Sequence, residues 1–113
     1  MLLPKAINAY VPPEKLVEYV LSEKHAVGRE KARFFRAHGY DDTTAALLAR
    51  DLLEIARRNR VRETLSTPFG IKYVIGGTLS TPRGTLVAVT TVWIVEADSE
   101  RPRFVTVLPR EKR

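Results

Sequence analysis

The feature that most constrains the fold is a change in the period of the apolar residues near Val61. Before this point apolar residues recur every three to four positions, which is typical of amphipathic helices, and after it they recur every second position, which is typical of strands. We therefore expect helices over residues 13–21, 29–37 and 43–58, and strands over residues 61–66, 71–79, 85–95 and 103–108.

Short local signals indicate where the helices begin and end. Pro13 stands at the start of the first helix, where its missing N–H costs nothing. Gly39 stands where the left-handed C-cap of the second helix belongs. Asp41 or Asp42 is expected to cap the third helix.

The strands are joined by recognisable turns. Ser-Thr-Pro-Phe-Gly at 66–70 and Ser-Thr-Pro-Arg-Gly at 80–84 are nearly identical, and proline followed by glycine favours a hairpin turn. The loop 96–102 makes the last connection, so the sheet should be an antiparallel meander. We predict an α+β fold with three N-terminal helices packed on one face of a four-stranded antiparallel meander sheet. One domain would span residues 1–113, with a helical half (1–60) and a sheet half (61–113).

The third strand is apolar on both faces. Leu86, Ala88, Val92 and Ile94 alternate with Val87, Val89, Trp93 and Val95. One helix layer covers only one face of a sheet, so the second face must meet something else. Three interpretations stay open: burial on both sides by the helices and a terminus, a substrate groove, or a partner interface that includes Trp93.

The charge of the chain favours a polyanionic partner. The net charge is +6 and the isoelectric point is near 10.0, and the excess is mostly arginine, whose planar fork suits phosphate. A GC-rich or heat-adapted genome is the alternative source of the arginines. The absence of cysteine excludes disulfides, cysteine-ligated zinc and thiol catalysis. Because the carboxylates are scattered and no apolar run reaches membrane-spanning length, we expect no metal, no cofactor, no membrane contact and a cytoplasmic location.

The segment from His25 to Phe35, His-Ala-Val-Gly-Arg-Glu-Lys-Ala-Arg-Phe-Phe, is the best candidate for a functional site. Its histidine lies on a glycine-containing loop before a helix that opens with Arg29 and Lys31. Imidazole exchanges a proton near neutral pH, and cations beside it stabilise a phosphate or an oxyanion. The alternatives are a solvent-exposed His25 and a Lys31 that only extends along the helix surface. His38 is assigned to the C-terminal end of the same helix and left out of the site.

Several motifs resemble those of a small, uncharacterised bacterial domain family. They are Leu3-Pro4, the His-x-Val-Gly-x-x-Lys-Ala-x-Phe-Phe run from His25, Phe69-Gly70, Thr91-Val-Trp-Ile94 and the closing Val105-Thr106-Val-Leu-Pro109. The order of elements also looks like that of the metal-independent RNase toxins of toxin–antitoxin and polymorphic toxin systems. The resemblance implies an endoribonuclease in which the RNA 2′-OH attacks the adjacent phosphate.

The resemblance also implies roles for particular residues. His25 would be the general base or acid, with Lys31 or Arg29 stabilising the phosphate oxygens. The remaining candidates are hydrogen-bond donors from strands (Thr106, Thr91), stacking rings (Trp93, Tyr73) and cations that steer the RNA backbone (Arg110, Lys112). For Trp93 the alternative is a place in the core, and both threonines also fit strand propensity alone. The implied partners are RNA and a cognate antitoxin or immunity protein.

Two other functions compete with the RNase hypothesis. A non-catalytic basic module would bind nucleic acid or an acidic protein, within a larger complex, and its binding would survive loss of His25. A structural subunit would use its apolar sheet face as a homodimer interface.

Overall fold

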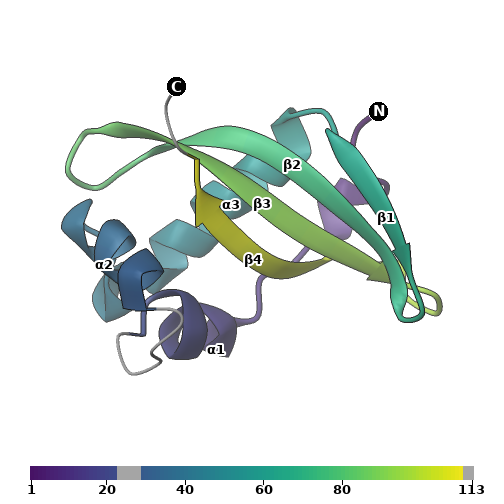
Figure 1. Cartoon of the computed structure of the whole chain (residues 1–113), viewed down its shortest axis with the longest axis horizontal. Helices are drawn as coiled ribbons and strands as arrows, with labels where there is room; N and C mark the ends of the chain where they lie inside the picture. The colour runs from purple at the N-terminus through teal and green to yellow at the C-terminus, as the bar shows by residue number, and fades with distance from the viewer. Residues whose placement is uncertain (23–28, 111–113) are drawn as a thin grey trace.

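The computed structural model describes residues 1–22 and 29–110 and has the predicted α+β architecture (Figure 1). Helices come first and a four-stranded antiparallel sheet of order β1-β2-β3-β4 follows. The elements are η1 (Ala6–Asn8), α1 (Pro13–Lys15), η2 (Leu16–Val20), α2 (Arg29–Ala37), η3 (Asp42–Thr44), α3 (Ala45–Arg58), β1 (Glu63–Thr67), β2 (Gly70–Ser80), β3 (Leu86–Glu96) and β4 (Arg103–Pro109).

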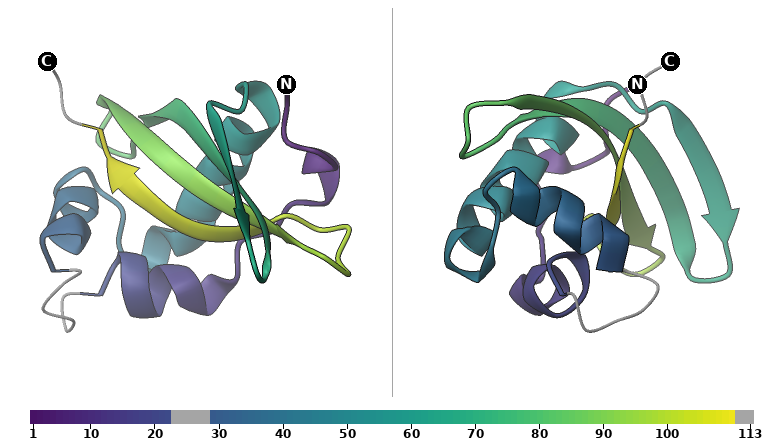
Figure 2. Two further views of the ribbon diagram at one scale, coloured as in Figure 1. Left: turned by 45° about the vertical axis from the view of Figure 1, so that its right-hand side comes forward. Right: turned by 60° about the vertical axis from the view of Figure 1, so that its left-hand side comes forward.

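The helices lie on one side of the sheet. In Figures 1 and 2, α3 crosses behind the long strands, and α1 and α2 lie toward the β4 side. Leu48, Leu52 and Ile55 of α3 are buried against the strands. Gly77 lets α3 approach β2 closely, because a Cβ added there would lie 2.7 Å from the Ile55 side chain.

The first helix differs from the prediction in its second turn. Its last part, η2, is π-helical, and the Leu21 N–H donates to the Leu16 carbonyl over 2.7 Å. This wider turn buries Leu16, Val20 and Leu21 but leaves Val17 38% exposed. The sequence pattern predicts an apolar stripe at Leu16, Val17, Val20 and Leu21; three of these four side chains are buried, and the π-helical turn places Val17 toward solvent.

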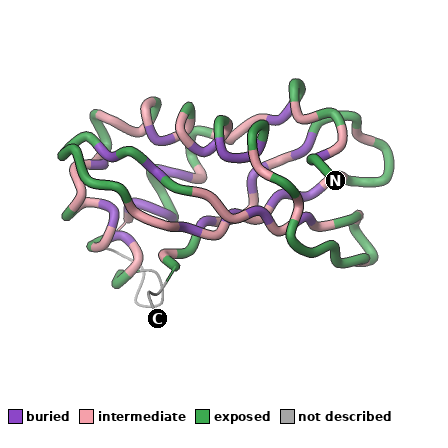
Figure 3. The backbone as a smooth tube through the Cα atoms, turned by 90° about the horizontal axis from the view of Figure 1, so that it is seen from above, coloured by how far each residue is buried: buried purple, intermediate pink, exposed green. Residues whose placement is uncertain are grey.

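The third strand directs Val89, Thr91 and Trp93 into the core, where all three are fully buried. Buried and less buried positions alternate along β2 and β3 (Figure 3). On the opposite face, the outer face, Val92 is half-buried and Ile94 is 4% exposed. No described helix covers this outer face in the figures; cationic side chains reach it instead.

Candidate anion-binding site

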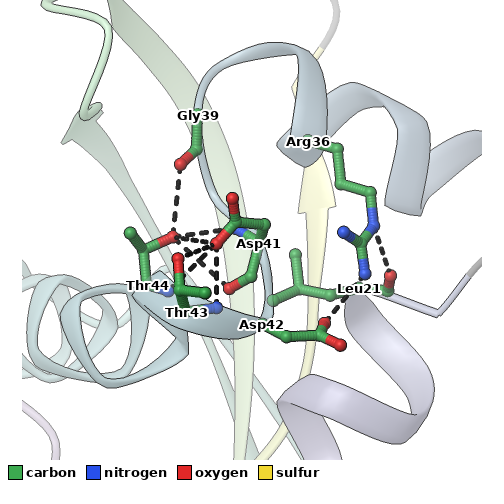
Figure 4. Close-up of polar contacts among 7 residues, drawn as sticks. All are labelled: Leu21, Arg36, Gly39, Asp41, Asp42, Thr43 and Thr44. Carbon is green, nitrogen blue, oxygen red and sulfur yellow. Dashed lines mark hydrogen bonds and ion pairs between the residues drawn. The ribbon is translucent and has the colours of Figure 1, made fainter.

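A network of polar contacts fixes the position of α2 (Figure 4). The Arg36 Nε donates to the Leu21 carbonyl over 2.8 Å, and its Nη2 lies 2.9 Å from Asp42 Oδ1. Arg36 thus connects the end of η2, the last turn of α2 and the start of η3. Phe35 and Ala32 of the same helix are fully buried. The helix that begins at Arg29 is therefore held firmly against the core.

The chain leaves α2 through a left-handed glycine and enters the next helix through a capping box. Gly39 has φ of 99°, which favours glycine over other residues. Asp41, rather than Asp42, is the cap: its carboxylate accepts from the backbone N–H groups of Thr43 and Thr44, and the Thr44 hydroxyl accepts from Asp41 N–H. The Thr43 hydroxyl also donates to this carboxylate, and that bond, together with those from the backbone N–H groups, holds the pKa of Asp41 below its usual value.

Lys31 and Thr106, which the sequence analysis assigned to one site, do meet. The Lys31 ammonium donates to Thr106 Oγ1 over 2.9 Å, although 75 positions separate the two residues. Burial of its side chain lowers the pKa of Lys31, and the positive charge of nearby Lys15 lowers it further. Within the part of the chain that the structure describes, no carboxylate pairs with Lys31. A half-buried ammonium without a counter-ion is suited to receive an anion.

Two arginines meet elsewhere on the outer face of the sheet. Arg62 precedes β1 and Arg110 follows β4, and both guanidinium groups reach Gly76 in the middle of β2. A Cβ added to Gly76 would lie 2.9 Å from the Arg62 Cζ and 3.6 Å from an Arg110 nitrogen. Thr106, Thr90 and Gly76 belong to the same face, since Val107 and Thr91 between them point into the core.

Three of the proposed substrate-binding residues lie in the core. Trp93 is fully buried and packs edge-on against Phe104, with ring centroids 5.5 Å apart. Its Nε1 donates to Thr91 Oγ1 over 2.9 Å, and that hydroxyl donates to the Ile75 carbonyl over 2.8 Å. Tyr73, the cross-strand neighbour of Trp93, is 7% exposed. In this conformation Trp93 and Tyr73 have no accessible ring face on which a base could stack, and the Thr91 hydroxyl is used internally.

The remaining candidates are distributed as follows. Arg29 is exposed at the start of α2, and Arg110 is exposed beside Arg62. His25 and Lys112 lie outside the described residues, so their roles stay predictions. His38, which was left out of the site, contacts Thr85 Oγ1 through Nδ1 over 2.9 Å and so joins α2 to the turn after β2.

Arg62 was missed by the sequence analysis. A glycine inside a strand often marks a place where another group approaches closely, and Gly76-Gly77 was that signal. Gly77 makes room for Ile55, and Gly76 makes room for Arg62. Charge alone could not select Arg62 among 19 lysines and arginines.

The described residues hold neither a metal-binding cluster nor a membrane-spanning helix. Within residues 1–22 and 29–110, no group of three histidine, aspartate or glutamate side chains lies close enough to hold a metal ion. In the same ranges, no helix has the length and apolar character that crossing a bilayer requires.

These features define an α+β domain with N-terminal helices on a four-stranded antiparallel sheet and cations gathered on the outer face of that sheet. The sequence matches the family described as a domain of unknown function (DUF6883) over residues 2–111, and the chain belongs to that family. No curated protein matches the sequence.

A solved structure shares the fold. It is described as a contact-dependent growth inhibition toxin–immunity protein complex from Klebsiella pneumoniae 342. The TM-score is 0.72 and the identity 18%, and the alignment covers 97% of this chain and 100% of that chain. At this identity the likeness establishes the fold alone.

Proposed function

We propose that this chain is a toxin-type endoribonuclease that cleaves RNA without a metal ion. The observation that carries the proposal is the Lys31 ammonium, which is half-buried, has a lowered pKa, has no carboxylate partner among the described residues and is oriented by Thr106. A cation fixed in advance at a partly dehydrated site stabilises the charge that develops on a phosphate during cleavage.

The reaction needs only proton transfers and charge stabilisation. A base removes the proton from the RNA 2′-OH, and the 2′ oxygen attacks the adjacent phosphorus. The bond from phosphorus to the 5′ oxygen then breaks, and that oxygen takes up a proton. The products are a 2′,3′-cyclic phosphate and a 5′-hydroxyl. In this proposal Lys31 stabilises the phosphate oxygens, Thr106 positions Lys31, and His25 supplies or removes a proton.

The structural relative supports this proposal. Its description names a toxin and an immunity protein. The net charge of +6 on this chain suits the toxin of such a pair if its substrate is a polyanion such as RNA. By the same reasoning we propose a cognate immunity protein that places acidic side chains over Lys31 and its surroundings.

A non-catalytic RNA-binding module is the second candidate. The exposed Arg62–Arg110 pair favours it, because guanidinium groups hold phosphates without any chemistry. The two candidates differ in what they require of Lys31. Cleavage depends on one ammonium in one place, whereas binding is spread over several cations.

The test is cleavage of total RNA, both free and in intact ribosomes, by purified protein in EDTA. Lys31→Met keeps most of the side chain but removes the ammonium, and we expect it to slow cleavage by about 10²-fold or more. Thr106→Val should cause a smaller loss, because Lys31 remains but is no longer oriented. Lys5→Met is the matched control: it removes an equal charge from an exposed lysine that pairs with Glu100.

Cleavage by the wild type and by Lys5→Met, with loss in Lys31→Met, would support the nuclease. Equal cleavage by all variants would contradict the proposed role of Lys31. RNA binding without cleavage of either substrate would rule out the nuclease and leave the binding module.

A further inference from the structure

The convergence of Arg62 and Arg110 on Gly76 calls for a separate explanation. The two residues come from opposite edges of the sheet: Arg62 N–H donates to the Val74 carbonyl beside β1, and Arg110 N–H donates to the Ala88 carbonyl beyond β4. Their side chains nevertheless extend over the outer face toward the same point on β2. This arrangement exists because position 76 has no side chain.

The charges of these two arginines are not neutralised by any described carboxylate. Two guanidinium groups that approach one point repel each other unless an anion lies between them. Among the described residues, neither arginine forms an ion pair or a side-chain hydrogen bond, and neighbouring Glu63 pairs with neither. Two planar guanidinium groups offer several N–H donors in the geometry that phosphate oxygens accept.

A hydroxyl lies beside the pair. Thr90 is the direct cross-strand partner of Gly76, so its side chain is on the same face of the sheet. No described residue takes a hydrogen bond from the Thr90 hydroxyl or gives one to it. The donors around Gly76 are therefore two arginines and one threonine, a set that is common in contacts to nucleic-acid phosphates.

We propose that Arg62 and Arg110 form a second phosphate-binding site, which holds a backbone phosphate of single-stranded RNA away from the bond that is cleaved. The identity of the ligand as RNA rests on the proposed function. Arg110 follows Thr106 by four residues of extended chain, about 13 Å at the usual rise of a strand. One RNA strand would thus contact Lys31 at one phosphate and the arginine pair at another.

Gly76→Ala provides an unusual test because it alters no charge. The added methyl group would collide with the end of the Arg62 side chain, which is flexible and exposed, so Arg62 should move while the strand keeps its structure. Arg62→Gln and Arg110→Gln remove one charge each. Arg50→Gln is the matched control, because Arg50 is on the solvent side of α3, across the sheet from Gly76.

The assay measures fluorescence anisotropy of a short 2′-O-methyl oligoribonucleotide, which lacks the attacking hydroxyl and cannot be cleaved. Arg62→Gln and Arg110→Gln should each weaken binding roughly tenfold and reduce the slope of log K against log salt by about 0.7. Gly76→Ala should weaken binding several-fold at unchanged charge and melting temperature, while Arg50→Gln stays within about twofold of wild type.

Either of two results would overturn the second site. In one, Arg62→Gln and Arg110→Gln bind no more weakly than Arg50→Gln, which would leave the pair as a surface for an acidic protein. In the other, Gly76→Ala binds like the wild type. Cleavage of unmodified RNA is measured separately, so selective loss of binding in a protein that cleaves nothing would refute the nuclease and retain the site.

Discussion

Thr91→Val tests whether Thr91 stabilises the core rather than contacting a substrate. Its hydroxyl accepts from the buried Trp93 Nε1 and donates to the Ile75 carbonyl. Valine has nearly the same shape but leaves the buried indole N–H without an acceptor, at a cost of about 1–3 kcal/mol for an unsatisfied buried group, and it removes the side-chain bond to the Ile75 carbonyl. We expect a total loss of about 2–3 kcal/mol in the free energy of unfolding. For a chain of 113 residues, each kcal/mol lowers the melting temperature by about 4 °C.

Urea denaturation of Thr91→Val and Thr90→Val provides the comparison. Thr90 is the next residue on β3 but faces outward, and valine there should change stability by less than about 0.5 kcal/mol. A double variant adds a further check: Trp93→Phe should cost less in the Thr91→Val background than in the wild type, because its indole N–H has already lost its partner. Equal stability of Thr91→Val and wild type would refute the assignment of Thr91 to the core.

Three shorter predictions concern pH and packing. The pKa of Lys31 is lowered, and its ammonium is the form that stabilises the phosphate. As pH rises, cleavage should therefore decline at a lower pH than the usual pKa of a lysine predicts. A Lys31→Arg variant should stay active to higher pH. This is contradicted if kcat/KM of the wild type and of Lys31→Arg declines at the same alkaline pH. Gly77→Ala should lower the melting temperature because its Cβ would press on Ile55, whereas Gly76→Ala should not, and the two melting curves decide the point. Asp41→Asn should destabilise the fold above the pKa of free aspartate, with a difference that shrinks as pH falls and Asp41 is protonated; a difference that is constant with pH would exclude the capping charge.

Most of the fold could be predicted because it depends on local patterns. The two hydrophobic periods and the proline–glycine turns placed the helices and strands to within a few residues. The π-helical turn was missed because a stripe at Leu16, Val17, Val20 and Leu21 fits an ordinary α-helix equally well.

The sequence indicated part of the candidate site because a histidine and two cations stand close together in one short segment. Lys31 and Thr106 were both named from the sequence, but the contact between them depends on how α2 packs beside β4. The sequence could not show which face of the sheet carries the Trp93 side chain, because both faces of its strand are apolar. Only the packing of α3 determines which face becomes the core. Arg62 was missed because no local pattern shows that a side chain will cross the sheet.

The most direct test of the proposed function is the chemistry of the RNA ends after incubation with the protein in EDTA. Fragments from the wild type should carry a 2′,3′-cyclic phosphate and a 5′-hydroxyl, and Lys31→Met should yield almost none. Fragments that carry a 5′-phosphate, or cyclic-phosphate fragments produced equally by Lys31→Met, would contradict the proposal that Lys31 stabilises an attack by the 2′-OH.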